Sequence, residues 1–160
     1  ITNVLENLSL DKQAHFLGIL LKDGKINTHM CPIQGRCNFR LQIDHGIAYD
    51  LLAYSLSNGN LSAALDLSYY YKEGIIVPRD ISIAYDLAKL SSLGNRLDYW
   101  VEINKWGQEF LNIKGKNGLV IDGRIGPKTC RAVASHFNWD PAIYRCGDVF
   151  LKNTIIRLSL

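Results

Sequence analysis

The first third of the chain contains the residue types of a cysteine-dependent hydrolase. Cys31 lies close in sequence to His29, and Asp44 stands beside His45. Such an enzyme needs a thiolate near a histidine base and a polar group that orients the histidine. However, Cys31 does not open a helix, and Cys37 offers its sulfur a disulfide instead. We therefore expect no catalytic residue here, and Cys31 and His45 are the candidates if one exists.

The cysteines fall as two pairs, Cys31 with Cys37 and Cys130 with Cys146. Their number is even and neither spacing is that of a zinc ribbon, so disulfides are the better interpretation and no metal or other cofactor is expected. Of the three possible connectivities, the local pairing needs the least rearrangement of the chain. Disulfides predict an oxidising compartment, either the bacterial periplasm or the cell exterior. The alternative is four reduced thiols in a cytosolic protein.

Composition and charge narrow the class of protein. The chain has 160 residues, of which 48% are hydrophobic, enough for one ordinary domain or two small ones. No apolar run approaches the roughly 20 residues of a membrane-spanning helix. The net charge of +3 is concentrated in residues 96–160, where ten Lys/Arg face six Asp/Glu. Such a surplus favours binding to an anionic polymer. The sequence lacks the dense basic stripe with interleaved aromatics that predicts nucleic-acid binding.

An internal repeat organises the first part of the chain. The pentapeptide Ile-Ala-Tyr-Asp-Leu occurs at residues 47–51 and again at 83–87, an offset of 36 (83 minus 47). Each copy is preceded by a segment that ends at glycine and by an aspartate, and each is followed by Gly-Asn. The matched positions are Gly24 and Gly74, Asp44 and Asp80, and Gly59-Asn60 and Gly94-Asn95.

Each copy is expected to form two antiparallel helices. In the second copy, apolar residues recur at helical spacing ahead of Gly74, which stops the first helix, and Pro78 prevents its resumption. Asp80 is then placed to cap the second helix. The first copy differs by an insertion at about residues 27–42. A disulfide between the two cysteines of this insertion would restrict its freedom.

This arrangement resembles the Sel-one-like repeat, a short relative of the tetratricopeptide repeat. The best match runs from Gly59 through the Val-Pro-Arg-Asp connector, residues 77–80, to Asn95. The resemblance implies a short α/α solenoid over residues 1–94, whose surface binds a protein partner.

Residues 118–129, Gly-Leu-Val-Ile-Asp-Gly-Arg-Ile-Gly-Pro-Lys-Thr, contain one predicted turn between two elements. Leu119–Ile121 favour an extended strand. Asp122-Gly123 supplies the turn, because glycine adopts positive φ without a Cβ penalty. Pro127 suits the first turn of the helix that follows.

The pattern Asp-Gly-x-x-Gly-x-x-Thr is similar to the signature of small helical peptidoglycan-binding domains. The longer form resembles the C-terminal domain of phage-type N-acetylmuramidases, over about residues 95–137. The resemblance implies contact with the cell wall. The residues proposed to bind the ligand are Asp122, Gly123, Arg124, Gly126, Lys128, Thr129 and Trp106.

Muramidases of that type also carry an N-terminal Glu-Gly-Gly-Tyr-like motif, whose glutamate acts as the acid in glycoside cleavage. Here Glu6 is followed by Asn-Leu-Ser, so the motif is missing. A glutamate in a first turn is typically a partner of the helix dipole, and Glu6 is only a candidate acid.

We therefore expect a mainly α-helical protein with repeats over residues 1–94 and a peptidoglycan-binding-like domain over residues 95–160. The expected function is non-catalytic binding of peptidoglycan, with a protein partner on the repeats and no nucleic acid or membrane span. One alternative is a peptidoglycan hydrolase, a muramidase or an amidase, with an unrecognised site. Another is a secreted effector or immunity-type binding protein.

Overall fold

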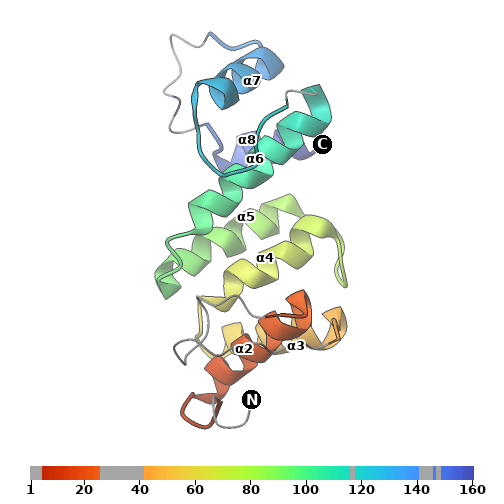
Figure 1. The fold of residues 1–160 in the computed structure, drawn as a ribbon, viewed down its shortest axis with the longest axis vertical. Coiled ribbons are helices and arrows are strands. Elements are labelled where there is room, and N and C mark those ends of the chain that lie inside the picture. The colour runs from red at the N-terminus through yellow and green to blue at the C-terminus, as the bar shows by residue number, and fades with distance from the viewer. Residues whose placement is uncertain (1–4, 26–41, 116–117, 141–145, 147–148) are drawn as a thin grey trace. The chain divides into compact units, whose positions relative to one another are not determined.

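The chain is mainly helical in a computed structural model, which confirms the predicted fold class (Figure 1). The structure describes residues 5–25, 42–115, 118–140, 146 and 149–160. The chain divides into two compact units, Ile1–Arg96 and Leu97–Leu160. This division lies two residues beyond the boundary expected from the repeats.

The first unit consists of two helical hairpins. Its helices are α2 (Leu10–Asp23), α3 (His45–Ser57), α4 (Ala63–Glu73) and α5 (Ile81–Leu90), followed by the 3-10 helix η2 (Ser91–Gly94). Helix α2 packs on α3 and α4 packs on α5, while α3 also contacts α4 (Figure 1).

The two hairpins share their local signals. The Asp44 carboxylate accepts a hydrogen bond from the N–H of Ile47 at 3.0 Å, and Asp80 accepts one from Ile83 at 2.9 Å. These bonds satisfy N–H groups that have no partner within the helix. Helices α2 and α4 both end at a glycine with positive φ, Gly24 at 68° and Gly74 at 74°. The order of stops and caps is therefore the same in both copies. Residues 26–41, most of the insertion, lie outside the described residues.

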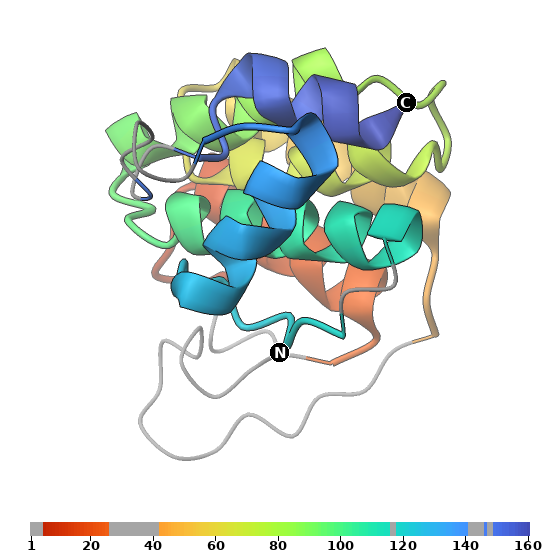
Figure 2. The same cartoon turned by 90° about the horizontal axis from the view of Figure 1, so that it is seen from above.

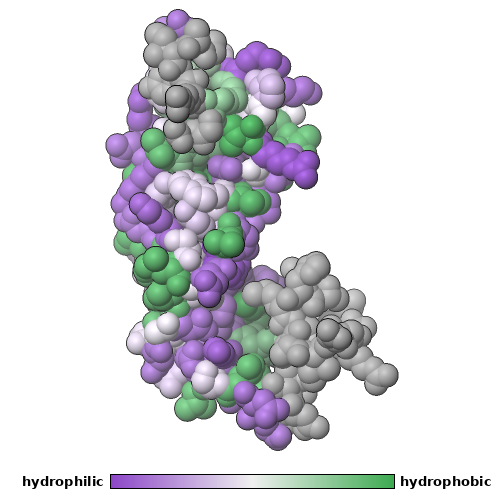
Figure 3. All heavy atoms as spheres, turned by 90° about the vertical axis from the view of Figure 1, so that its left-hand side faces the viewer, coloured by the Kyte–Doolittle hydropathy of each residue, from purple (hydrophilic) through white to green (hydrophobic). Residues whose placement is uncertain are grey.

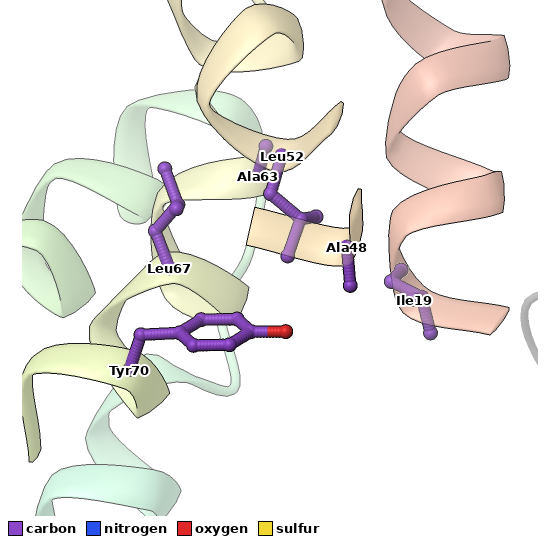
Figure 4. Close-up of a cluster of buried hydrophobic side chains, with 6 residues drawn as sticks. All are labelled: Ile19, Ala48, Leu52, Ala63, Leu67 and Tyr70. Carbon is purple, nitrogen blue, oxygen red and sulfur yellow. The ribbon is translucent and has the colours of Figure 1, made fainter. Parts of the chain in front are cut away.

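A hydrophobic core joins the first three helices of this unit (Figure 4). It contains Ile19 from α2, Ala48 and Leu52 from α3, and Ala63, Leu67 and Tyr70 from α4. Small residues bring the helices close together. A Cβ atom added to Gly18 would lie 2.8 Å from Cγ of Leu52, so α2 can approach α3 at this distance only with glycine.

A buried ion cluster links α2, α4 and the end of the first unit. Asp66 accepts hydrogen bonds from Lys22 at 2.9 Å and Arg96 at 3.3 Å, and its Oδ2 lies 2.9 Å from Nε2 of His15. Burial alone would raise the pKa of the Asp66 carboxyl. The hydrogen bond with His15 and the charge of Lys22 outweigh burial and lower that pKa. Asp66 therefore remains charged inside the protein and connects segments far apart in sequence.

The second unit is built on α6 (Tyr99–Gly115), with α7 (Pro127–Phe137) and α8 (Lys152–Ser159) packed against it. Figure 2 shows α7 crossing α6. Ile103 and Leu111 of α6 are fully buried, as is Ile155 of α8. Gly107 leaves room on α6 for the ring of Phe150, which a Cβ atom at this position would overlap.

The strand expected at Leu119–Ile121 does not form, and no strand occurs among the described residues. The Asn112 side chain donates to the carbonyl of Leu119 and accepts from its N–H, both at 2.8 Å. A side-chain amide thus takes the place of the neighbouring strand that a sheet requires. Val120 is 75% exposed, as expected for a loop.

Candidate functional site

Three amide side chains on α6 hold the loop that precedes α7. Asn104, Gln108 and Asn112 are spaced by four residues, so they lie along one face of the helix. All three donate hydrogen bonds to residues 118–126, which we call the motif loop. The loop is therefore attached along two turns of α6.

Gln108 makes the central contacts with the motif loop. Its Nε2 donates to Oδ1 of Asp122 at 3.0 Å and to the carbonyl of Arg124 at 2.9 Å, and its Oε1 accepts from the N–H of Gly123 at 2.8 Å. Asn104 donates to the Gly123 carbonyl at 2.9 Å. The Gln108 side chain is fully buried. Because a buried amide without partners is costly, these bonds specify one loop conformation.

Asp122 shapes the loop that it belongs to. Its carboxylate accepts a hydrogen bond from the N–H of Arg124 at 2.8 Å as well as the bond from Gln108. The backbone bond from Arg124, followed by the Gln108 bond, lowers the pKa of Asp122. Asp122 is thus ionised in neutral solution, and its exposed carboxylate organises the turn from within.

The two glycines of the signature have different roles. Gly123 has φ of 76°, and a Cβ atom there would lie 2.6 Å from the carbonyl oxygen of Val101. It therefore serves both the turn and the close approach to α6. Gly126 has φ of −111° and caps α7, with no atom near the position of a Cβ. Pro127 follows as the first helical residue, as the sequence predicts.

An open hollow lies between α7 and the beginning of the motif loop. It has a volume of about 370 Å³ and is lined by Gly118, Leu119, Lys128, Arg131, Ala132 and Ser135. Lys128, Arg131 and Ser135 are spaced by three and four residues, so they share one face of α7. Neither Lys128 nor Arg131 forms an ion pair with any residue that the structure describes. We call this feature the cationic hollow.

The proposed ligand residues separate into an exposed and a buried group. Asp122, Arg124 and Lys128 are exposed. Thr129 and Trp106 are 4% and 6% exposed, so both belong to the core and offer little surface to a ligand. Sequence analysis missed Gln108, Arg131 and Ser135. The four-residue spacing of the α6 amides and the helical spacing from Lys128 were the signals that could have found them.

The catalytic candidates do not assemble into a site among the described residues. Glu6 is exposed in a turn ahead of α2. His45 is the first residue of α3, and its ring centroid lies 5.9 Å from that of Tyr70. Asp44 is occupied as the cap of α3. Cys31 and Cys37 lie outside the described residues.

The second cysteine pair forms the predicted disulfide. Cys130 on α7 is bonded to Cys146, with their Cα atoms 5.9 Å apart. In the part of the chain that the structure describes, no group of three or more His, Cys, Asp or Glu could hold a metal ion. The described helices are all too short or too polar to cross a membrane.

Comparison of the chain with protein-family models found no match, and comparisons with curated proteins and with solved structures found none either.

Proposed function

We propose that the chain binds bacterial peptidoglycan without cleaving it and that its second unit carries the ligand site. The supporting observation is the motif loop, which the α6 amides hold in a single conformation beside the cationic hollow. A pre-shaped loop binds with a smaller loss of conformational entropy than a loose one. The loop also presents Arg124 to solvent, and the first turn of α7 presents Lys128, where both can reach a polymeric ligand.

The charge and the disulfide support the same function. Residues 96–160 carry ten Lys/Arg and six Asp/Glu, and this excess attracts a polymer whose peptides bear carboxylates. Disulfides persist in oxidising compartments, so the bond between Cys130 and Cys146 favours a periplasmic or secreted protein. Peptidoglycan is accessible in both places.

The repeats are proposed to bind a protein partner. Ile47 and Ile83 are the first residues of the two pentapeptides, and they are 53% and 42% exposed. Equivalent helices thus present the same apolar residue to solvent. On the side of the molecule in Figure 3, apolar side chains lie in small groups among hydrophilic ones. Such a mixed surface suits a protein interface better than a membrane.

Sedimentation with purified sacculi tests the proposal. The full chain should pellet with sacculi, and Arg124→Ala should weaken this binding because it removes an exposed cation while leaving the backbone bonds of the loop. Lys114→Ala, an exposed cation at the end of α6, is the matched control and should bind as the wild type does. A wild-type chain that stays in the supernatant would refute the proposal.

The same samples separate binding from hydrolysis. Mass spectrometry of the supernatant should find no muropeptides released by the protein. Their release would instead support the alternative of a peptidoglycan hydrolase with a site outside the residues described above.

A further inference from the structure

We propose that the cationic hollow binds a free carboxylate of the peptidoglycan peptide stem and that Lys128 and Arg131 recognise it. This inference rests on the proposed function and assigns the chemical group that the second unit binds. The proposed carboxylate site lies on the side of α7, whereas the sequence signature is centred on the motif loop.

Two of the residues that line the hollow are small. Ala132 follows Arg131 on α7 and is 6% exposed. Gly118 has φ of 59°, and a Cβ atom there would have no neighbour within 4 Å. A volume of about 370 Å³ is at the lower end of the range for small-ligand pockets, roughly 300–1,000 Å³. The hollow therefore suits the end of a short peptide.

None of the described residues around the hollow neutralises its positive charge. No acidic residue is among those that line it, and the first turn of α7 contains none. Lys128 and Arg131 have no ion-pair partner among the described residues. Arginine offers parallel N–H groups that match the two oxygens of a carboxylate, and lysine adds a mobile point charge. The Ser135 hydroxyl can donate a further hydrogen bond.

The residues that line the hollow suit the peptide stem of peptidoglycan better than its sugar chain. Sugar rings are typically bound by stacking on aromatic side chains, and none of the described residues that line the hollow is aromatic. Leu119 supplies an apolar wall whose backbone N–H and carbonyl are already bonded to Asn112. Leu119 is 9% exposed, so only a small part of its side chain faces the hollow. Carboxylates in peptidoglycan belong to the peptide stems, so a stem terminus fits both charge and shape.

Calorimetric titration with soluble disaccharide peptides tests the inference on the full chain. The wild type should bind the unmodified muropeptide, and methyl esterification of its carboxylates should weaken binding at least about tenfold, the equivalent of one charge-assisted hydrogen bond. The double variant Lys128→Ala/Arg131→Ala should lose at least about the same factor and should no longer distinguish acid from ester. Lys114→Ala again serves as the control.

The outcomes separate this inference from the proposed function. If the double variant is folded by circular dichroism and binds the acid as tightly as the wild type, the hollow is not the carboxylate site, although the chain still binds peptidoglycan. Equal binding of chitin oligosaccharides, which carry no carboxylate, or preference for a phosphate polymer such as teichoic acid, would also overturn the carboxylate assignment. If the wild type binds neither muropeptides nor sacculi, the proposed function itself fails.

Discussion

Gln108 on α6 donates a 3.0 Å hydrogen bond to the carboxylate of Asp122 in the motif loop. This bond joins the most characteristic residue of the Asp-Gly signature to a buried amide that lies outside it. Gln108 and Asp122, together with Gly123, shape the motif loop. This role explains why the signature contains Asp followed by Gly. Arg124 and Lys128, the exposed cations of the longer motif, are available to a ligand.

Replacing Gln108 with alanine should destabilise the second unit. The change removes three hydrogen bonds and leaves the N–H of Gly123 and the carbonyl of Arg124 without their partner, at a cost of about 3 kcal/mol. Urea unfolding followed by circular dichroism measures this loss. The exposed Lys114→Ala on the same helix should change the free energy of unfolding by less than about 0.5 kcal/mol. Equal effects of the two changes would contradict the assigned role of Gln108.

The signature glycines should respond differently to alanine. Gly123→Ala combines a positive φ with a clash against Val101, so it should cost more than about 1 kcal/mol. Gly126→Ala has neither problem and should be tolerated, apart from a small loss of capping. Thermal melts of the two variants provide the comparison. A Gly126 variant less stable than the Gly123 variant would show that the loop conformation described here is wrong.

The ion cluster around Asp66 should make the first unit sensitive to acid. The pKa of Asp66 is lower in the folded than in the unfolded chain, so unfolding takes up a proton. The stability that the cluster contributes is complete above about pH 4, the ordinary pKa of an aspartate, and is lost as the pH falls below it. Unfolding free energies measured between about pH 7 and pH 2.5 should show this decline.

Asp66→Asn is the corresponding variant. It should lose about 3 kcal/mol at neutral pH, because the Lys22 ammonium loses its buried counter-ion, and its acid-dependent decline should be smaller than that of the wild type. Asp50→Asn makes the same chemical change at an exposed position of α3 and should preserve the wild-type pH profile. An unchanged acid profile in Asp66→Asn would exclude the cluster as its cause.

The disulfide should stabilise the second unit. Cys130 and Cys146 are separated by 16 residues, and cross-linking a loop of this size contributes about 3 kcal/mol by limiting the unfolded chain. The double variant Cys130→Ser/Cys146→Ser should therefore melt at a lower temperature than the oxidised wild type. Identical melting curves, with the bond verified by peptide mapping, would show that the cross-link adds no stability.

The helix ends were predicted well, because the residues that determine them lie close together in the sequence. Two helices are capped by aspartates, Asp44 and Asp80. Two helices stop at glycines, Gly24 and Gly74, and one starts at Pro127. All of these signals act through contacts within a few residues. These contacts are local, so their residue types are sufficient to predict them.

Features that depend on distant partners were missed. The apolar residues Leu119–Ile121 suit a strand, but Asn112 bonds Leu119 instead. His15 and Asp66 are 51 residues apart, and only the contact between the first and second hairpins brings them together. The cationic hollow likewise needs the motif loop in place beside α7. For the same reason, the burial of Trp106 and Thr129 was not evident from their neighbours in the sequence.

The central claim is that the second unit binds peptidoglycan, and a nuclear magnetic resonance titration tests it most directly. Isotope-labelled full chain is titrated with a soluble disaccharide peptide, and the shifts of the backbone amides are followed. Saturable shifts concentrated between Leu119 and Ser135 are expected. No shifts at millimolar ligand, or shifts confined to the first unit, would contradict it.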